Sequence, residues 1–89
     1  MTWKVVVTGK VQGVFFRAST KDCASELGLQ GWVRNDPDGT VRIVVQGPEP
    51  KFKSFLKWAH KGPDHARVDQ VDWEEIEEEE IFSEFRVKR

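Results

Sequence analysis

The spacing of apolar residues along this chain alternates between the two-residue period of a strand and the three-to-four-residue period of a helix. β-branched residues fill Trp3–Thr8, which predicts a first strand that Gly9 ends. The period then changes, and a helix is predicted from Phe16 to the stop signal at Gly28. Its inward face consists of Phe16, Thr20, Cys23, Ala24 and Leu27.

A hairpin follows this helix in the pattern. Gly31–Asn35 has the composition of a second strand, and Asp36-Pro37-Asp38-Gly39 contains the residues of a tight turn. In the third strand Val41, Ile43 and Val45 alternate with Arg42, Val44 and Gln46. The first three are predicted to be buried and the second three to lie on a more exposed face.

The remaining chain predicts one more helix and two more strands. A helix is expected to start at Pro50 and to bury Phe52, Phe55, Leu56 and Ala59. Strands are expected at 68–76 and at 81–87, the latter with Phe85 and Val87 on one face.

This order is β-α-β-β-α-β with one added C-terminal strand, which predicts an α/β sandwich of the ferredoxin-like type. We expect one domain over residues 1–89, in which two helices cover one face of a mostly antiparallel sheet. A β-α-β crossover returns the chain parallel to its first strand. The first two strands should therefore end at the same sheet edge, which brings Arg17 close to Asn35.

Composition narrows the choice of partners. The chain has 14 Lys and Arg against 15 Asp and Glu, so a nucleic-acid partner is not expected. No apolar run approaches the ~20 residues that a membrane helix needs, and no apolar signal region follows Met1. With the single Cys23, these features predict a cytoplasmic protein without a membrane partner. The acidic run 74–80 is interpreted as solvated surface.

Arg17 stands at an unfavourable place, because a cation in the first turn of a helix is repelled by the helix dipole. A bound anion would offset that repulsion. Gly9 and Gly13 allow the preceding loop to take positive φ, and successive N–H groups of such a loop form an anion-binding concavity. The guanidinium fork of Arg17 would complete a cradle for a phosphate.

The loop before Arg17 lacks Cys, Ser and His, so attack on phosphorus by a protein nucleophile is not expected. Cys23 lies on the inward face of its helix, and the sequence has no metal-ligand cluster or Walker lysine pattern. The remaining mechanism is direct attack of water on phosphorus, with Asn35 as a neutral group that holds the water. The leaving group must then be weakly basic, as a carboxylate is, because no general acid stands ready.

The segments GKVQGVFFR (9–17) and GWVRNDPDGTV (31–41) resemble the acylphosphatase family, whose members hydrolyse the carboxyl-phosphate bond of acyl phosphates. The resemblance implies no cofactor and no metal. Arg17 matches the family's phosphate-binding arginine, and Asn35 matches its water-orienting asparagine. The resemblance also implies that main-chain amides bind phosphate at Gln12, Gly13, Val14, Phe15 and Phe16. One departure is the ending Val87-Lys88-Arg89, where family chains often carry an aromatic residue.

The expected partners are therefore a small acyl phosphate as substrate and inorganic phosphate as product and inhibitor, for a monomeric enzyme. Two alternatives stay open at this point. One is a catalytically silent module that binds phosphate or carbamoyl phosphate. The other is an RNA-binding sheet, since the paired Phe15 and Phe16 faintly match an aromatic recognition motif.

Overall fold

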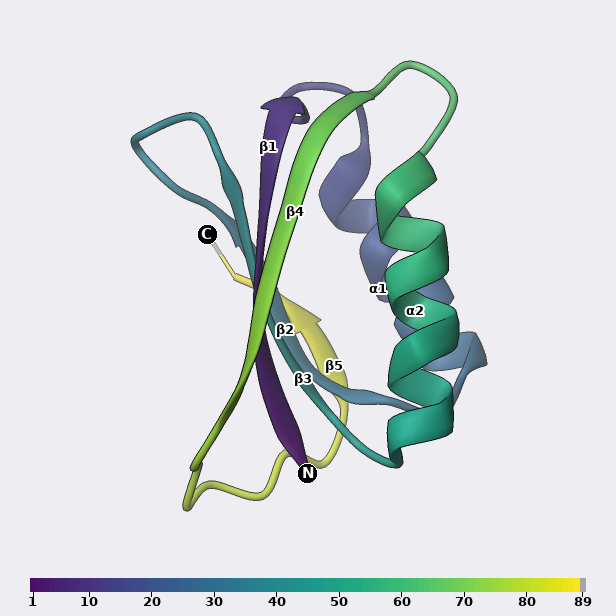
Figure 1. Ribbon diagram of the computed structural model, residues 1–89, viewed down its shortest axis with the longest axis vertical. Coiled ribbons are helices and arrows are strands. Elements are labelled where there is room, and N and C mark those ends of the chain that lie inside the picture. Colours follow the sequence, from purple (N-terminus) through teal and green to yellow (C-terminus); the bar gives the residue numbers. More distant parts are fainter. Residues whose placement is uncertain (89) are drawn as a thin grey trace.

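The computed structural model describes residues 1–88 as five strands and two helices in the predicted order. The strands are β1 (Thr2–Lys10), β2 (Gln30–Asn35), β3 (Val41–Gln46), β4 (Arg67–Ile76) and β5 (Phe85–Val87). The helices are α1 (Phe16–Glu26) and α2 (Glu49–Lys61). Figure 1 shows both helices on the same side of the sheet. The predicted fold class is confirmed.

The sheet has the strand order β4-β1-β3-β2-β5. β3 lies in the centre and pairs antiparallel with both β1 and β2, and β4 pairs antiparallel with β1. β1 and β2 therefore run in the same direction, as the crossover rule predicted. The added strand β5 pairs parallel with β2, through Gly31↔Phe85 to Val33↔Val87.

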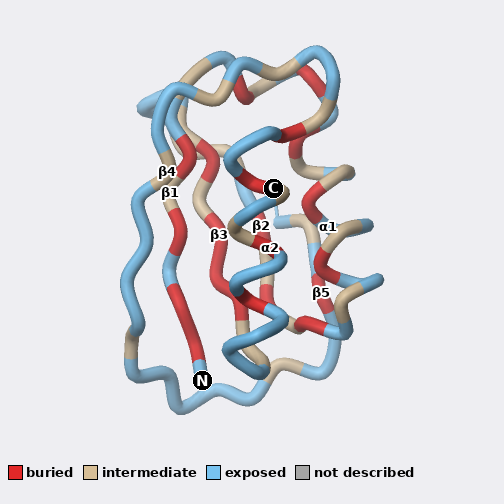
Figure 2. The backbone as a smooth tube through the Cα atoms, turned by 45° about the vertical axis from the view of Figure 1, so that its right-hand side comes forward, coloured by how far each residue is buried: buried red, intermediate tan, exposed pale blue. Residues whose placement is uncertain are grey.

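The core lies between the sheet and the helices, where Figure 2 shows buried segments on β1, β3 and the inner sides of α1 and α2. Trp3 of β1 stacks on Phe52 of α2 with ring centroids 4.0 Å apart. Burying one such ring contributes about 1.5–3 kcal/mol. The helices bury six of the residues that their periodicity predicted, Phe16, Thr20, Ala24, Phe52, Phe55 and Ala59. Leu56, which was also predicted to be buried, is half-buried, and so are Cys23 and Leu27 of the predicted inward face of α1, all three packed against the core.

The predicted stop at Gly28 is confirmed. Gly28 has φ of 74°, its N–H donates to the Ser25 carbonyl at 3.0 Å, and the next N–H, of Leu29, donates to the Ala24 carbonyl at 2.9 Å. These two bonds are the Schellman arrangement, in which a glycine takes the left-handed conformation that ends a helix.

The prediction that Gly9 ends the first strand is wrong. β1 continues to Lys10 because Gly9 forms an irregular pair with Val68 across a register shift, with φ of 137°. A side chain here would collide with the carbonyl of Arg67, so glycine permits the close approach of β4 at the point where the register skips Asp69. The bulge therefore lies in β4 opposite Gly9, and β1 continues one residue further, to Lys10.

Two further predictions need correction. The last strand begins at Phe85 instead of Ile81, since Ile81 is 88% exposed and the N–H of Phe82 donates to the side chain of Gln46. Val44, predicted to lie on a more exposed face, is buried. Val44 is buried because Lys4 of β1 and Trp32 of β2, its partners in the two adjoining strands, flank it on that outer face. The other boundaries differ by one or two residues, which is the normal uncertainty of helix and strand ends.

We predict that Gly31→Ala lowers the free energy of unfolding by about 3 kcal/mol or more. Gly31 has φ of 140°, and an added Cβ would overlap the carbonyl oxygen of Val44 in the neighbouring strand. Gly28→Ala is the matched control, because Gly28 also has positive φ but faces open space, and it should cost only about 1–2 kcal/mol. Urea unfolding measures both. Equal losses would contradict the role assigned to the collision.

Candidate active site

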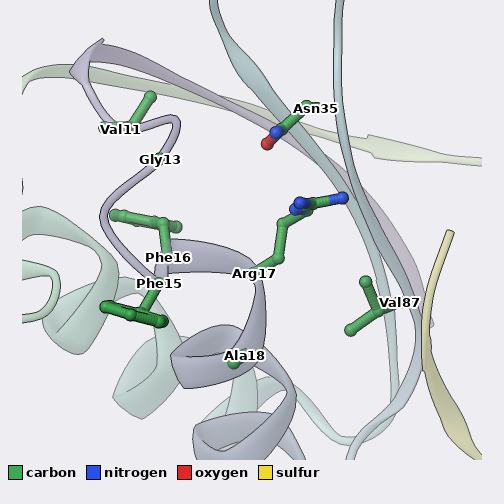
Figure 3. A pocket seen from close by; sticks show the side chains of 8 residues that line it. All are labelled: Val11, Gly13, Phe15, Phe16, Arg17, Ala18, Asn35 and Val87. Carbon is green, nitrogen blue, oxygen red and sulfur yellow. The ribbon is translucent and has the colours of Figure 1, made fainter. Parts of the chain in front are cut away.

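A pocket of about 400 Å³ lies at the sheet edge where β1 and β2 end. Arg17 comes from the first turn of α1 and Asn35 is the last residue of β2, and both line this pocket. The structure therefore brings together the two residues that the sequence placed at one edge. Figure 3 shows the lining residues, which are Val11, Gly13, Phe15, Phe16, Arg17, Ala18, Asn35 and Val87.

The side chain of Arg17 extends from α1 towards Asn35 (Figure 3). Within residues 1–88 its guanidinium forms no hydrogen bond and no ion pair, and the first turn of α1 holds no acidic residue to balance its charge. A half-buried guanidinium with all five N–H donors available is suited to bind a tetrahedral oxyanion through two parallel hydrogen bonds.

The loop between β1 and α1 curls at two residues with positive φ, Gly13 at 74° and Phe15 at 62°. Phe15 occupies the N-cap position of α1 without a side-chain cap. In the part of the chain that the structure describes, none of the backbone N–H groups of residues 12–16 donates a hydrogen bond to the protein. A curled loop with free N–H groups at a helix N-terminus has the geometry that binds anions elsewhere.

Asn35 contributes an unusual polar atom to the site. Its Oδ1 is buried and has no hydrogen-bond partner among the described residues. A buried acceptor left without a partner costs about 1–3 kcal/mol. A neutral carboxamide can donate to one group and accept from another, so it can orient a water molecule without any change of protonation.

Two residues of the predicted phosphate loop do not line the pocket. The side chain of Val14 is packed into the core. Gln12 turns towards the β2–β3 hairpin, where its Nε2 donates to the carbonyls of Asp36 at 2.8 Å and Thr40 at 2.9 Å. Val14 and Gln12 are expected to bind phosphate through their main-chain N–H groups. The direction of their side chains does not change that prediction.

The thiol of Cys23 is unsuited to act as a nucleophile. Burial, and then the nearby Glu26 carboxylate, raise its pKa from 9.0 to about 11, so that it is protonated near pH 7. Residues 1–88 contain no group of three or more His, Cys, Asp or Glu side chains that could hold a metal ion. No helix among them is long and apolar enough to cross a membrane.

Sequence reasoning missed part of the pocket wall and the side-chain contacts of Gln12. Val11, Ala18 and Val87 line the pocket, but nothing in a single sequence distinguishes Val11 from an ordinary core residue or Ala18, which is exposed, from an ordinary surface residue of a helix. For Val87 the sequence predicted only that it shares a face with Phe85, and the structure places the two at alternate positions of β5, with Phe85 buried and Val87 half-buried.

Comparison with known proteins now identifies the family. The acylphosphatase family model matches residues 3–87. An acylphosphatase of Marinobacter nauticus is 50% identical over 84 residues, which cover 94% of this chain and 91% of the relative. The chain therefore belongs to the acylphosphatase family.

Solved structures agree with this assignment. The acylphosphatase of Coxiella burnetii has a TM-score of 0.93 at 45% identity, covering 98% of this chain and 90% of the other. The acylphosphatase of Bacillus subtilis has a TM-score of 0.95 at 32% identity, covering 99% of this chain and 98% of the other. These findings favour an enzyme over the silent binding module and the RNA-binding sheet.

We predict that Phe15→Asn raises the free energy of unfolding by about 1 kcal/mol. Phe15 has φ of 62°, where asparagine is strained far less than phenylalanine, and the residue is 78% exposed, so little packing is lost. Phe15→Ala is the control because it removes the ring and keeps the strain, and it should bring no gain. Chemical denaturation measures the three proteins. A Phe15→Asn protein no more stable than Phe15→Ala would show that strain at this position is negligible.

Proposed function

We propose that this acylphosphatase hydrolyses the carboxyl-phosphate bond of a small acyl phosphate by direct attack of water, with Arg17 and Asn35 as the catalytic residues. The observation that carries the proposal is the pairing in one pocket of an unpartnered guanidinium with an unpartnered carboxamide oxygen. The products are a carboxylate and inorganic phosphate.

The phosphate group binds first to positive and partly positive groups of the loop and α1. The free N–H groups of Gln12, Gly13, Val14, Phe15 and Phe16 donate to its oxygens from one side. The guanidinium of Arg17 donates from the other side, so that charge developing on the phosphoryl oxygens meets donors already in place. The anion in turn offsets the repulsion between Arg17 and the dipole of α1.

Water attacks phosphorus from the side on which Asn35 lies. The side-chain carboxamide of Asn35 accepts a hydrogen bond from the water. This bond directs a lone pair of the water oxygen towards phosphorus, on the side opposite the departing carboxylate. Positioning and charge stabilisation supply most of the catalysis in phosphoryl transfer. The carboxylate is a weak base and leaves without a proton, so the pocket needs no general acid.

We also infer that inorganic phosphate, as the product, occupies the same cradle and competes with substrate. We further propose that the enzyme acts as a monomer, because Arg17, Asn35 and the phosphate loop of the same chain supply every group that the proposed mechanism needs.

Arg17 is tested with benzoyl phosphate as substrate, in excess chelator, where we expect the wild-type protein to keep full activity. Arg17→Ala should lower kcat/KM by about 10³-fold or more, and Arg17→Lys by at least about 10²-fold, because an ammonium does not replace a planar fork. Lys21→Ala is the control, since it removes an exposed cation of α1 that does not line the pocket. Wild-type rates from Arg17→Lys would overturn the assigned role.

Asn35→Ala should lower kcat by about 10²-fold or more while it changes the inhibition constant of inorganic phosphate by less than about threefold. The reason is that Asn35 is assigned to the water, and the loop and Arg17 are assigned to phosphate. Steady-state kinetics with phosphate as a competitive inhibitor measure both quantities. A parallel loss of phosphate affinity would make Asn35 a binding residue, and non-competitive inhibition would place phosphate elsewhere.

A further inference from the structure

The side chain of Gln12 connects the phosphate loop to the hairpin that follows Asn35. Its Nε2 donates two hydrogen bonds, to the carbonyls of Asp36 and Thr40, so both hydrogens of the amide are used. Because both acceptors are carbonyl oxygens, the amide must present its nitrogen to them. Among residues 1–88 these are the only hydrogen bonds between the loop and this hairpin.

The hairpin that receives these bonds is internally braced. The carbonyl of Asp36 also accepts from the N–H of Gly39 at 3.0 Å, and the carbonyl of Thr40 also accepts from the N–H of Asp36 at 2.9 Å. Asp38 accepts from the N–H and hydroxyl of Thr40 at 2.9 and 2.6 Å, and from Arg42 at 3.0 Å. The bonds from Thr40, followed by that from Arg42, hold the pKa of Asp38 well below its usual range. Gln12 is thus attached to a rigid turn.

The loop itself has few other constraints. Within the described residues 1–88, the backbone N–H groups of residues 12–16 donate no hydrogen bonds, and the segment is anchored in the core by the side chains of Val11, Val14 and Phe16. Apolar contacts are not directional, so they fix the distance of the loop from the core more than they fix its orientation. The two directional bonds of Gln12 orient it relative to the turn whose first residue, Asp36, directly follows Asn35.

We propose that Gln12 is a positioning residue, whose side chain holds the phosphate-binding loop in register with the hairpin that carries Asn35. This inference rests on the proposed function, because it assigns the loop to phosphate and Asn35 to the attacking water. Gln12 would then set the distance and angle between phosphorus and water. A displacement of about 1 Å between such groups can lower a rate about 10²-fold.

Gln46 supplies a matched control. Its side chain also bridges separate segments, since Nε2 donates to Thr2 Oγ1 at 3.1 Å and to the carbonyl of Glu80 at 3.0 Å, and Oε1 accepts from Phe82. Gln46 is the last residue of β3 and therefore lies at the opposite edge of the sheet from the pocket. Gln46→Ala and Gln12→Ala both break a glutamine bridge, but only the second breaks it beside the site.

The kinetic test is a double-mutant cycle of Gln12→Ala with Asn35→Ala. Gln12→Ala alone should lower kcat about 10- to 100-fold, and Gln46→Ala should leave kcat within about twofold of wild type even if it unfolds at a lower urea concentration. In the Asn35→Ala protein, Gln12→Ala should lower kcat by less than about threefold, because the water whose position it sets is already lost. Independent, multiplicative losses in the cycle would overturn the proposal.

Gln12→Glu tests the hydrogen bonds apart from the shape of the side chain. A carboxylate has nearly the same size but donates nothing to two carbonyls, so this variant should lose at least as much kcat as Gln12→Ala. Wild-type kcat in Gln12→Glu would contradict the role of the two donated bonds.

Backbone NMR order parameters separate a failure of this inference from a failure of the proposed function. In Gln12→Ala the order parameters of residues 12–15 should fall from about 0.85 towards about 0.6, and in Gln46→Ala they should not change. Unchanged order parameters in Gln12→Ala would overturn the positioning role of Gln12, whatever the kinetic result. If the order parameters fall in Gln12→Ala but Asn35→Ala keeps full activity, Gln12 holds the loop as proposed. The role of Asn35 in catalysis would then be overturned.

Discussion

The antiparallel pairing of β3 with both β1 and β2 is the constraint on which the rest of this molecule depends. It makes β1 and β2 run in the same direction, and so it brings the loop after β1 and the turn after β2 to the same edge of the sheet. β3 is held there by Val41, Ile43 and Val45, which are fully buried against the helices. The bulge in β4 opposite Gly9 keeps β1 paired as far as Lys10, where the loop at this edge begins. A slip of one residue in β3 would turn these side chains outward and separate the two halves of the pocket.

Several unfavourable features of the protein gather in one small region. Among residues 1–88, the guanidinium of Arg17 has no counter-ion, the N–H groups of the loop have no acceptor, Phe15 has positive φ and the buried Oδ1 of Asn35 has no donor, and all of these lie in or beside the pocket. The positive φ of Phe15 and the unpartnered oxygen of Asn35 each lower the stability of the protein, and in the proposed function an anion and a water supply the partners that the loop, Arg17 and Asn35 lack. The core below, with the stacked rings of Trp3 and Phe52, is stable enough to tolerate this.

The fold could be predicted from the sequence because its periodicities are clear and because crossover connections have a fixed hand. The same reasoning placed Arg17 and Asn35 at one edge, where both line the pocket, although their chemical roles stay predictions. The extent of the last strand could not be predicted, because Ile81 and Phe82 are as apolar as strand residues. Their irregular path shows only in the structure, where the N–H of Phe82 donates to the side-chain oxygen of Gln46 and Ile81 is exposed. The contacts of Gln12 were equally hidden, since a polar side chain in a loop gives no sign of its distant partner.

The two outer strands of the sheet have a consequence for behaviour in concentrated solution. β4 forms one border and carries Asp69, Asp72, Glu74 and Glu75, while β5 forms the other and is three residues long. An unpaired border of backbone N–H and carbonyl groups invites the strands of other molecules to add to it. Here the negative charge of β4 repels a second copy of the protein. β5 is too short to pair with a strand of another molecule. We therefore expect the protein to resist aggregation through its own sheet.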